Sequence, residues 1–216
     1  MNRPARLVVV AVTASTALLL TACGSGGGDD SSSDKIKGAD AGGEKTSAGP
    51  SATASQDAAG RPKIALSKDF RADFEGWTNS DPKLQAILDD GREELRSKYA
   101  AIIESNPDSD AVAFYNSGTS LTSAREWIKS FTDTDDGLIG EVTVYRPRVH
   151  INDTGSGVLF YCVDERKAST KNRKTGKVID TPDKPESVLQ YRERLDKTSQ
   201  GVWKNVSLTT VAGGCG

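Results

Sequence analysis

Histidine and cysteine are scarce in this chain, which has one histidine and three cysteines among 216 residues. A zinc site needs several Cys or His ligands, so zinc is not expected. The sequence also lacks the GxSxG turn of serine hydrolases and the glycine-rich motifs of nucleotide-binding proteins. Alternation places the single histidine, His150, on an exposed strand face beside Arg146 and Arg148. We therefore expect no catalytic histidine, no metal and no cofactor.

A calcium site is also not expected. The segment 133–137, with sequence DTDDG, comes nearest to a calcium-binding loop, but no glutamate follows at the last position of the 12-residue pattern. We interpret this segment as the solvated end of a helix.

No apolar run here is long enough to cross a membrane as a helix. The stretch Leu7–Leu20 has fourteen mostly apolar residues, whereas a transmembrane helix needs about 18–20. Arg3 and Arg6 precede it and supply the positive flank of a secretory signal. The N-terminus therefore indicates a cleaved signal peptide rather than a membrane span.

The end of this run and the next three residues, Leu20-Thr21-Ala22-Cys23, resemble the lipobox of bacterial lipoproteins. The resemblance implies that Cys23 receives a diacylglycerol, that residues 1–22 are removed, and that the lipid holds the protein on the extracytoplasmic face of the cell membrane. The alternative is an ordinary signal peptide that happens to contain a cysteine.

We expect residues 23–61 to be the lipidated cysteine followed by a disordered linker of small and polar residues. Between residues 24 and 60, Ile36 is the only large apolar side chain, so this segment cannot offset the entropy of ordering it. Residues 62–216 are the only plausible folded unit, and they are numerous enough for one domain with its own core.

Hydrophobic periodicity in the domain predicts helices first and strands afterwards. Asp81 and Pro82 have the character of an N-cap and a first helical residue, and apolar residues at 3.6-residue spacing continue that helix to about Glu104. The full set is a short strand at 70–75, helices at 82–104 and 120–131, and strands at 139–151, 157–165, 187–196 and 201–210. The stretch 111–116 is ambiguous, and 166–186 reads as a long polar connection with a turn at 174–177. A phase slip beside Pro147 predicts a β-bulge or a bend.

This order, with GEVTVYRPRVHI, FYCVDERKASTKNRKTGKV and GVWKNVSLTT followed by a cysteine, resembles a group of actinobacterial secreted lipoproteins. The resemblance implies an outer domain like the nuclear-transport-factor-2-like cone: an α+β fold with helices packed on a curved, mainly antiparallel sheet. The group has no defined activity, so the resemblance implies a fold and a location, not a reaction.

Enzymes with such cones place an acid and a tyrosine in an apolar pocket. The strand residues that we considered for such a pocket are Tyr145, Tyr161, Asp164 and Tyr191. Tyrosines in strands are more often amphipathic residues at the edge of a core. A small pocket enzyme of the proton-transfer kind (an isomerase or hydrolase) therefore stays as the alternative function.

Charge is unevenly distributed along the domain. Residues 69–141 carry 16 acidic and 7 basic side chains, and residues 142–216 carry 8 acidic and 13 basic ones. Residues 166–177 contain six basic side chains and no acidic one, and the four candidates for binding an anionic envelope polymer are Lys171, Arg173, Lys174 and Lys177. The alternative is a solvated hairpin that lysines keep soluble. The net charge of the chain does not favour a nucleic acid partner.

Cys162 and Cys215 remain after Cys23 is assigned to the lipid, in a compartment where disulfides persist. We predict that they form a structural disulfide that fixes the C-terminal tail to the central strand.

Together these features predict a membrane-tethered, extracytoplasmic binding or interaction module of the cell envelope, whose partner is an anionic polymer or another envelope protein.

Overall fold

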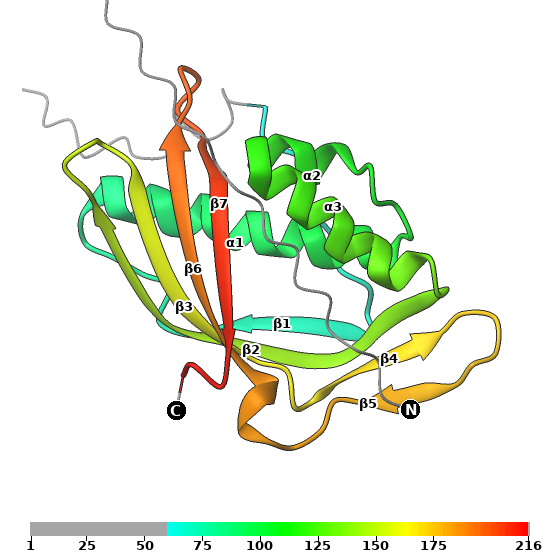
Figure 1. The fold of residues 1–216 in the computed structure, drawn as a ribbon. Helices are drawn as coiled ribbons and strands as arrows, with labels where there is room; N and C mark the ends of the chain where they lie inside the picture. Colours follow the sequence, from blue (N-terminus) through cyan, green and yellow to red (C-terminus); the bar gives the residue numbers. More distant parts are fainter. Residues whose placement is uncertain (1–59, 216) are drawn as a thin grey trace, which may run out of the picture. The chain divides into compact units, whose positions relative to one another are not determined.

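The computed structural model describes residues 60–215, and it confirms an α+β fold in which helices cover one face of a curved, mainly antiparallel sheet (Figure 1). The predicted signal peptide, Cys23 and nearly all of the linker lie outside the described residues. The helices are α1 (Pro82–Ile103), α2 (Asp110–Tyr115) and α3 (Gly118–Thr132). None of the helices in residues 60–215 is long and apolar enough to span a bilayer.

The sheet has the strand order β5-β4-β2-β3-β6-β7, with β1 pairing in parallel with β2. The strands are β1 (Phe70–Phe74), β2 (Asp136–Ile151), β3 (Gly157–Asp164), β4 (Ala168–Asn172), β5 (Val178–Asp180), β6 (Val188–Lys197) and β7 (Trp203–Ala212). A 3-10 turn, Pro185–Ser187, precedes β6. Because β2 pairs with β4 in its first part and with β3 in its second, it connects the two ends of the sheet.

Helix α1 begins where the sequence predicts. The Asp81 side chain accepts a hydrogen bond from the Lys83 backbone N–H at 2.7 Å, and Pro82 is the first helical residue. Gly91 lets the helix approach β3 closely, since a Cβ atom there would lie 2.6 Å from Leu159 Cδ2. The core therefore lies between α1 and the inner face of the sheet, the face that the helices cover.

The predicted bulge is confirmed in β2, where the pairing register with β3 shifts between Tyr145 and Arg148. Arg146 has a φ of 53°, a left-handed conformation that is uncommon for a residue with a Cβ atom. The bulge changes the alternation of the strand. Val144 before it and Val149 after it both pack on the core, while Tyr145 and His150 point to the outer face, the face away from the helices.

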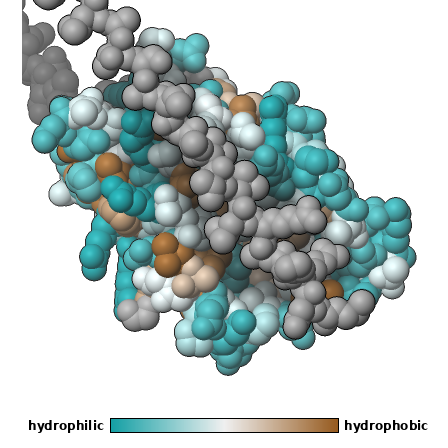
Figure 2. Space-filling view, viewed as in Figure 1, coloured by the Kyte–Doolittle hydropathy of each residue, from teal (hydrophilic) through white to brown (hydrophobic). Residues whose placement is uncertain are grey.

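Two segments differ from the sequence prediction. The ambiguous stretch forms the short helix α2, and the polar connection 166–186 contains the paired strands β4 and β5. Both strands of this hairpin consist largely of polar or exposed residues, so their alternation leaves no hydrophobic pattern to detect. The surface in Figure 2 is mostly hydrophilic, with apolar residues in small separate groups.

The predicted disulfide between Cys162 and Cys215 is confirmed. The two Cα atoms are 6.0 Å apart, and the bond joins β3 to the segment that follows β7. Gln190 Nε2 also donates a hydrogen bond to the Gly214 carbonyl at 3.0 Å. The tail is thus fixed to the outer face of the sheet.

Candidate functional site

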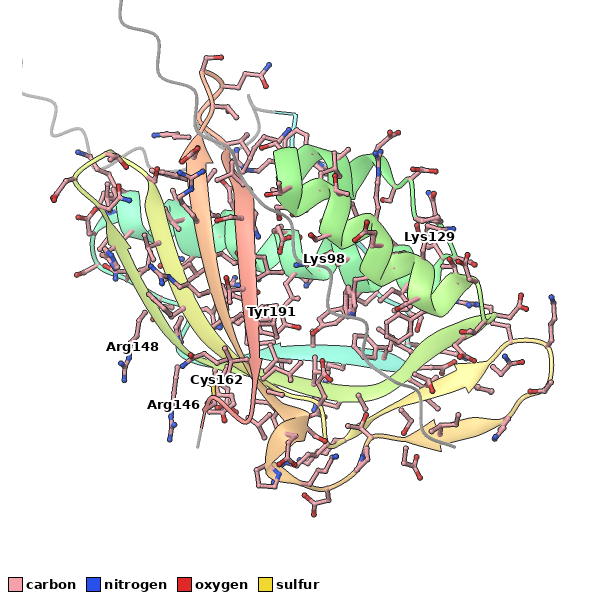
Figure 3. All side chains as sticks on the ribbon, in the orientation of Figure 1. Lys98, Lys129, Arg146, Arg148, Cys162 and Tyr191 are labelled. Carbon is pink, nitrogen blue, oxygen red and sulfur yellow. A yellow bond between two sulfur atoms is a disulfide. The ribbon has the colours of Figure 1, made fainter. Side chains whose placement is uncertain are left out.

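A cavity of about 360 Å³ lies between α3 and the inner face of β6 and β7. Helix α3 contributes Ala124, Trp127 and Phe131, which recur at helical spacing, and the two strands contribute Leu189, Tyr191, Leu208 and Thr210. Lys98 reaches it from α1, and Figure 3 shows Lys98 and Tyr191 on the side of the sheet that the helices cover. A smaller space of about 100 Å³ adjoins it and shares Trp127, Phe131 and Glu165.

Aromatic rings hold the shape of this cavity. Trp127 packs edge-on against Phe131 with 5.5 Å between ring centroids, and Tyr99 packs against Trp127 at 6.1 Å. Such pairs add stability beyond the area that they bury. The walls are therefore largely apolar and preorganised, which is typical of sites that bind small molecules.

Glu165 supplies the acidic group of the cavity. It directly follows β3, is half-buried, and lines both the larger and the smaller space. Burial, together with the neighbouring charge of Asp164, raises the pKa of Glu165 to about 7. Its carboxylate accepts no hydrogen bond and forms no ion pair within residues 60–215, so it is available to a ligand.

A buried charged network lies behind the cavity. Lys98 Nζ is 2.9 Å from Glu94 Oε1, and the two side chains are 3% and 0% exposed. The Tyr161 hydroxyl donates to Glu193 Oε1 at 2.6 Å, and Glu193 is also fully buried. Burial and the charge of Glu94 raise the pKa of Glu193. Tyr191 links the network to the cavity, because its ring stacks on Tyr161 with 5.0 Å between centroids.

The four strand residues considered for a pocket are not brought together. Tyr191 lines the cavity and Tyr161 lies behind it, but Tyr145 points to the outer face. Asp164 is held at the end of β3 by Arg166, with 2.6 Å between Oδ2 and Nη2. The sequence analysis missed Glu165, although alternation along β3 directs it to the opposite face from Asp164.

The basic hairpin has its cations in two kinds of environment. Arg173 donates to the backbone carbonyls of Ile102, Ile103 and Asp136, so it satisfies the C-terminal end of α1. Lys174 pairs with Asp135 at 2.7 Å. Lys171 and Lys177 are exposed. Binding of an anionic polymer by this hairpin stays a prediction.

Within residues 60–215, no cluster of three or more His, Cys, Asp or Glu side chains is arranged to hold a metal ion. No protein-family model matches the chain, and no curated protein matches it.

Several solved structures have a distantly similar chain path. The intermembrane space region of the chloroplast protein ARC6 has a TM-score of 0.41 at 9% identity, over 62% of this chain and 99% of that one. A ketosteroid isomerase-like protein from Erwinia carotovora atroseptica has 0.42 at 14% identity, over 60% and 95%. A structure from Catenulispora acidiphila has 0.42 at 8% identity, over 59% and 91%. At identities this low, these similarities transfer neither an activity nor a partner.

Proposed function

We propose that this protein is a lipid-anchored binding domain of the extracytoplasmic membrane face, and that the cavity under α3 holds a small, mainly apolar molecule. The observation that carries the proposal is the cavity itself, with about 360 Å³ of space, an aromatic wall and one unpaired carboxyl group. The volume lies in the range of small-molecule sites. The lipobox-like segment that ends at Cys23 supports the location.

The arrangement of polar groups favours binding over proton transfer. The tyrosine and carboxylate that hydrogen-bond to each other, Tyr161 and Glu193, are buried behind the cavity wall. A proton-transfer enzyme of the isomerase or hydrolase kind is the second candidate, because the raised pKa of Glu165 suits a general base at neutral pH.

Replacing Cys23 with Ala is expected either to release the protein from the membrane fraction or to leave it as the unprocessed precursor. The thiol is the group that would carry the lipid, so the variant has no anchor and is either released into the medium or left unprocessed. Fractionation followed by mass spectrometry of the N-terminal peptide measures this. An unmodified Cys23 in the membrane-bound native protein would contradict the lipid anchor.

Filling the cavity should weaken the binding of an uncharged apolar probe. We expect N-phenyl-1-naphthylamine to bind the full chain and to accept excitation energy from Trp127, which lines the cavity. Leu208→Phe adds a ring on the cavity side of β7 and should lower the probe affinity roughly tenfold or more, since lost apolar contact costs about 25 cal/mol per Å². Thr209→Phe adds the same ring on the outer face, next along the strand, and should leave affinity unchanged.

Glu165→Gln distinguishes the two candidate functions in the same assay. Burying an ionised carboxylate costs free energy, so the affinity of the native chain for the probe should fall as pH rises through about 7. The variant should lose this pH dependence and bind the probe at least as well as the native chain at pH 8.

Equal loss of binding in Leu208→Phe and Thr209→Phe would overturn the cavity proposal. Turnover of a carbonyl substrate that Glu165→Gln abolishes would favour the enzyme.

A further inference from the structure

The outer face of the sheet carries a group of arginines that the cavity does not use. Strand register places Phe160 between Arg148 on β2 and Arg192 on β6, and the next row across the strands is His150, Val158 and Arg194. Asp196, beside the second row, accepts a hydrogen bond from Ser156 at 2.6 Å and lies 4.0 Å from Arg194. No acidic side chain stands in either row, so the charged side chains of these two rows are all basic.

The bulge in β2 adds Arg146 to this group. It directs Arg146 and Arg148 to the same side of the sheet, and Figure 3 shows both side chains projecting away from the helices near Cys162. Arg146 is held in place by the Tyr145 ring, 5.5 Å away, and its Nη1 donates to the Cys215 carbonyl at 3.3 Å. The disulfide therefore helps to position an arginine.

These side chains surround a hollow of about 440 Å³. Arg146, Arg148 and His150 form one wall, and the other lining residues include Phe160, Gln190 and the two disulfide cysteines. Arg192 lies over the Phe160 ring at 5.3 Å. Arg148 and His150 are exposed and make no hydrogen bond or ion pair within residues 60–215. The hollow thus presents guanidinium and imidazole N–H donors that have no acceptor.

We propose that this hollow is a binding site for a phosphate ester. Two N–H groups of one guanidinium can donate to two oxygens of the same phosphate. Arg146 and Arg148 lie on one strand, and the imidazole N–H of His150 lies beside them, so the three side chains suit a single phosphate group. The phosphate comes either from a soluble glycerol phosphate polymer or from the headgroup of an anionic lipid. The site is separate from the cavity, and only the lipid source depends on the proposed membrane anchor.

The test compares two double variants of the full chain in neutral detergent. Arg146→Gln with Arg148→Gln removes two charges from the hollow, and Lys171→Gln with Lys177→Gln removes two from the hairpin, so the change in net charge is the same. The soluble probe is poly(glycerol phosphate), measured by calorimetry. The lipid probe is phosphatidylglycerol in the micelles, with phosphatidylcholine as its neutral counterpart.

Loss of the two arginines should weaken binding of at least one probe roughly tenfold or more, because each charge-assisted hydrogen bond contributes substantially. The lysine variant should change the affinity for either probe less than twofold. The probe whose binding weakens in the arginine variant shows whether the phosphate comes from the soluble polymer or from the lipid headgroup. Arg148→Gln alone keeps the Arg146 contact to the tail, so it tests the site if the double variant does not fold. Arg146→Lys with Arg148→Lys should bind with intermediate affinity, since the charge stays and the fork is lost.

Three results would overturn the site: no binding of either probe, equal binding by the native chain and the arginine variant, or an effect confined to the lysine variant. An effect confined to the lysine variant would indicate that the β4–β5 hairpin binds the phosphate ester instead. Failure here leaves the cavity proposal intact, because N-phenyl-1-naphthylamine is uncharged and reports on the cavity alone.

Discussion

Replacing Lys98 with Met is expected to lower the free energy of unfolding by about 3–5 kcal/mol, the usual cost of removing one partner from a buried ion pair. Lys98 Nζ lies 2.9 Å from Glu94 Oε1, and both side chains are almost completely buried. Glu193 is buried close enough for its charge to interact with both of these residues. Without the ammonium group, two carboxyl groups would share a dry space with no cation.

Lys129→Met is the matched control, because Lys129 also pairs with an acidic residue four positions away on a helix. Its Nζ is 3.0 Å from Asp133 Oδ1, but the two side chains are 54% and 63% exposed. Exposed pairs of this kind contribute about 0.3–0.5 kcal/mol. Guanidinium denaturation of both variants at pH 7, followed by far-UV circular dichroism, measures the difference.

A second variant separates pairing from packing. Glu94→Leu with Lys98→Met removes both charges and keeps the apolar volume, so it should recover a large part of the stability that Lys98→Met alone loses. If Lys98→Met cost no more than Lys129→Met, the buried pair would not be a determinant of stability.

Removing the disulfide should have a comparable effect. Changing both Cys162 and Cys215 to Ala is expected to lower the free energy of unfolding by about 4 kcal/mol or less. The chain-entropy estimate for a closed loop of this length, with the two cysteines 53 positions apart, gives that upper figure. The measurement is the same denaturation experiment, with the native protein under oxidising and reducing conditions.

The reduced native protein and the double Ala variant should unfold at similar denaturant concentrations, since both lack the cross-link. The variant should also bind a phosphate ester less well if the outer-face site exists, because Arg146 donates to the Cys215 carbonyl. A native protein whose stability does not change on complete reduction would contradict the role given to the bond.

The sequence predicts those parts of the fold that have a local signal. Asp81 and Pro82 mark the start of α1, the phase slip near Pro147 marks the bulge, and the count of cysteines identifies the disulfide. The hairpin β4–β5 was missed because its strands are polar, and α2 because six residues are too few to establish a helical period.

The candidate site was harder to predict because its residues come from distant segments. Trp127 and Leu208 look like ordinary core residues in the sequence, and only tertiary packing leaves space between them. Arg173 looks like a free cation, yet it donates to carbonyls at the end of α1, some seventy positions earlier in the chain. Alternation along β3 predicts that Glu165 points inward, but no pattern in the neighbouring sequence indicates that it lines a cavity.

The bulge at Arg146 also constrains how the length of the chain can vary. A strand that alternates strictly would present Tyr145 and Val149 on the same side, whereas here the first faces outward and the second packs inward. Deleting one residue between 145 and 148 would remove the extra residue of the bulge, so the strand would alternate strictly while Arg148 and His150 still face outward and Val149 still packs inward. Length changes among relatives should therefore gather in the turns at 152–156 and 173–177 or remove the bulge itself, and should be absent from the regularly paired parts of β2, where one residue fewer would exchange the two sides.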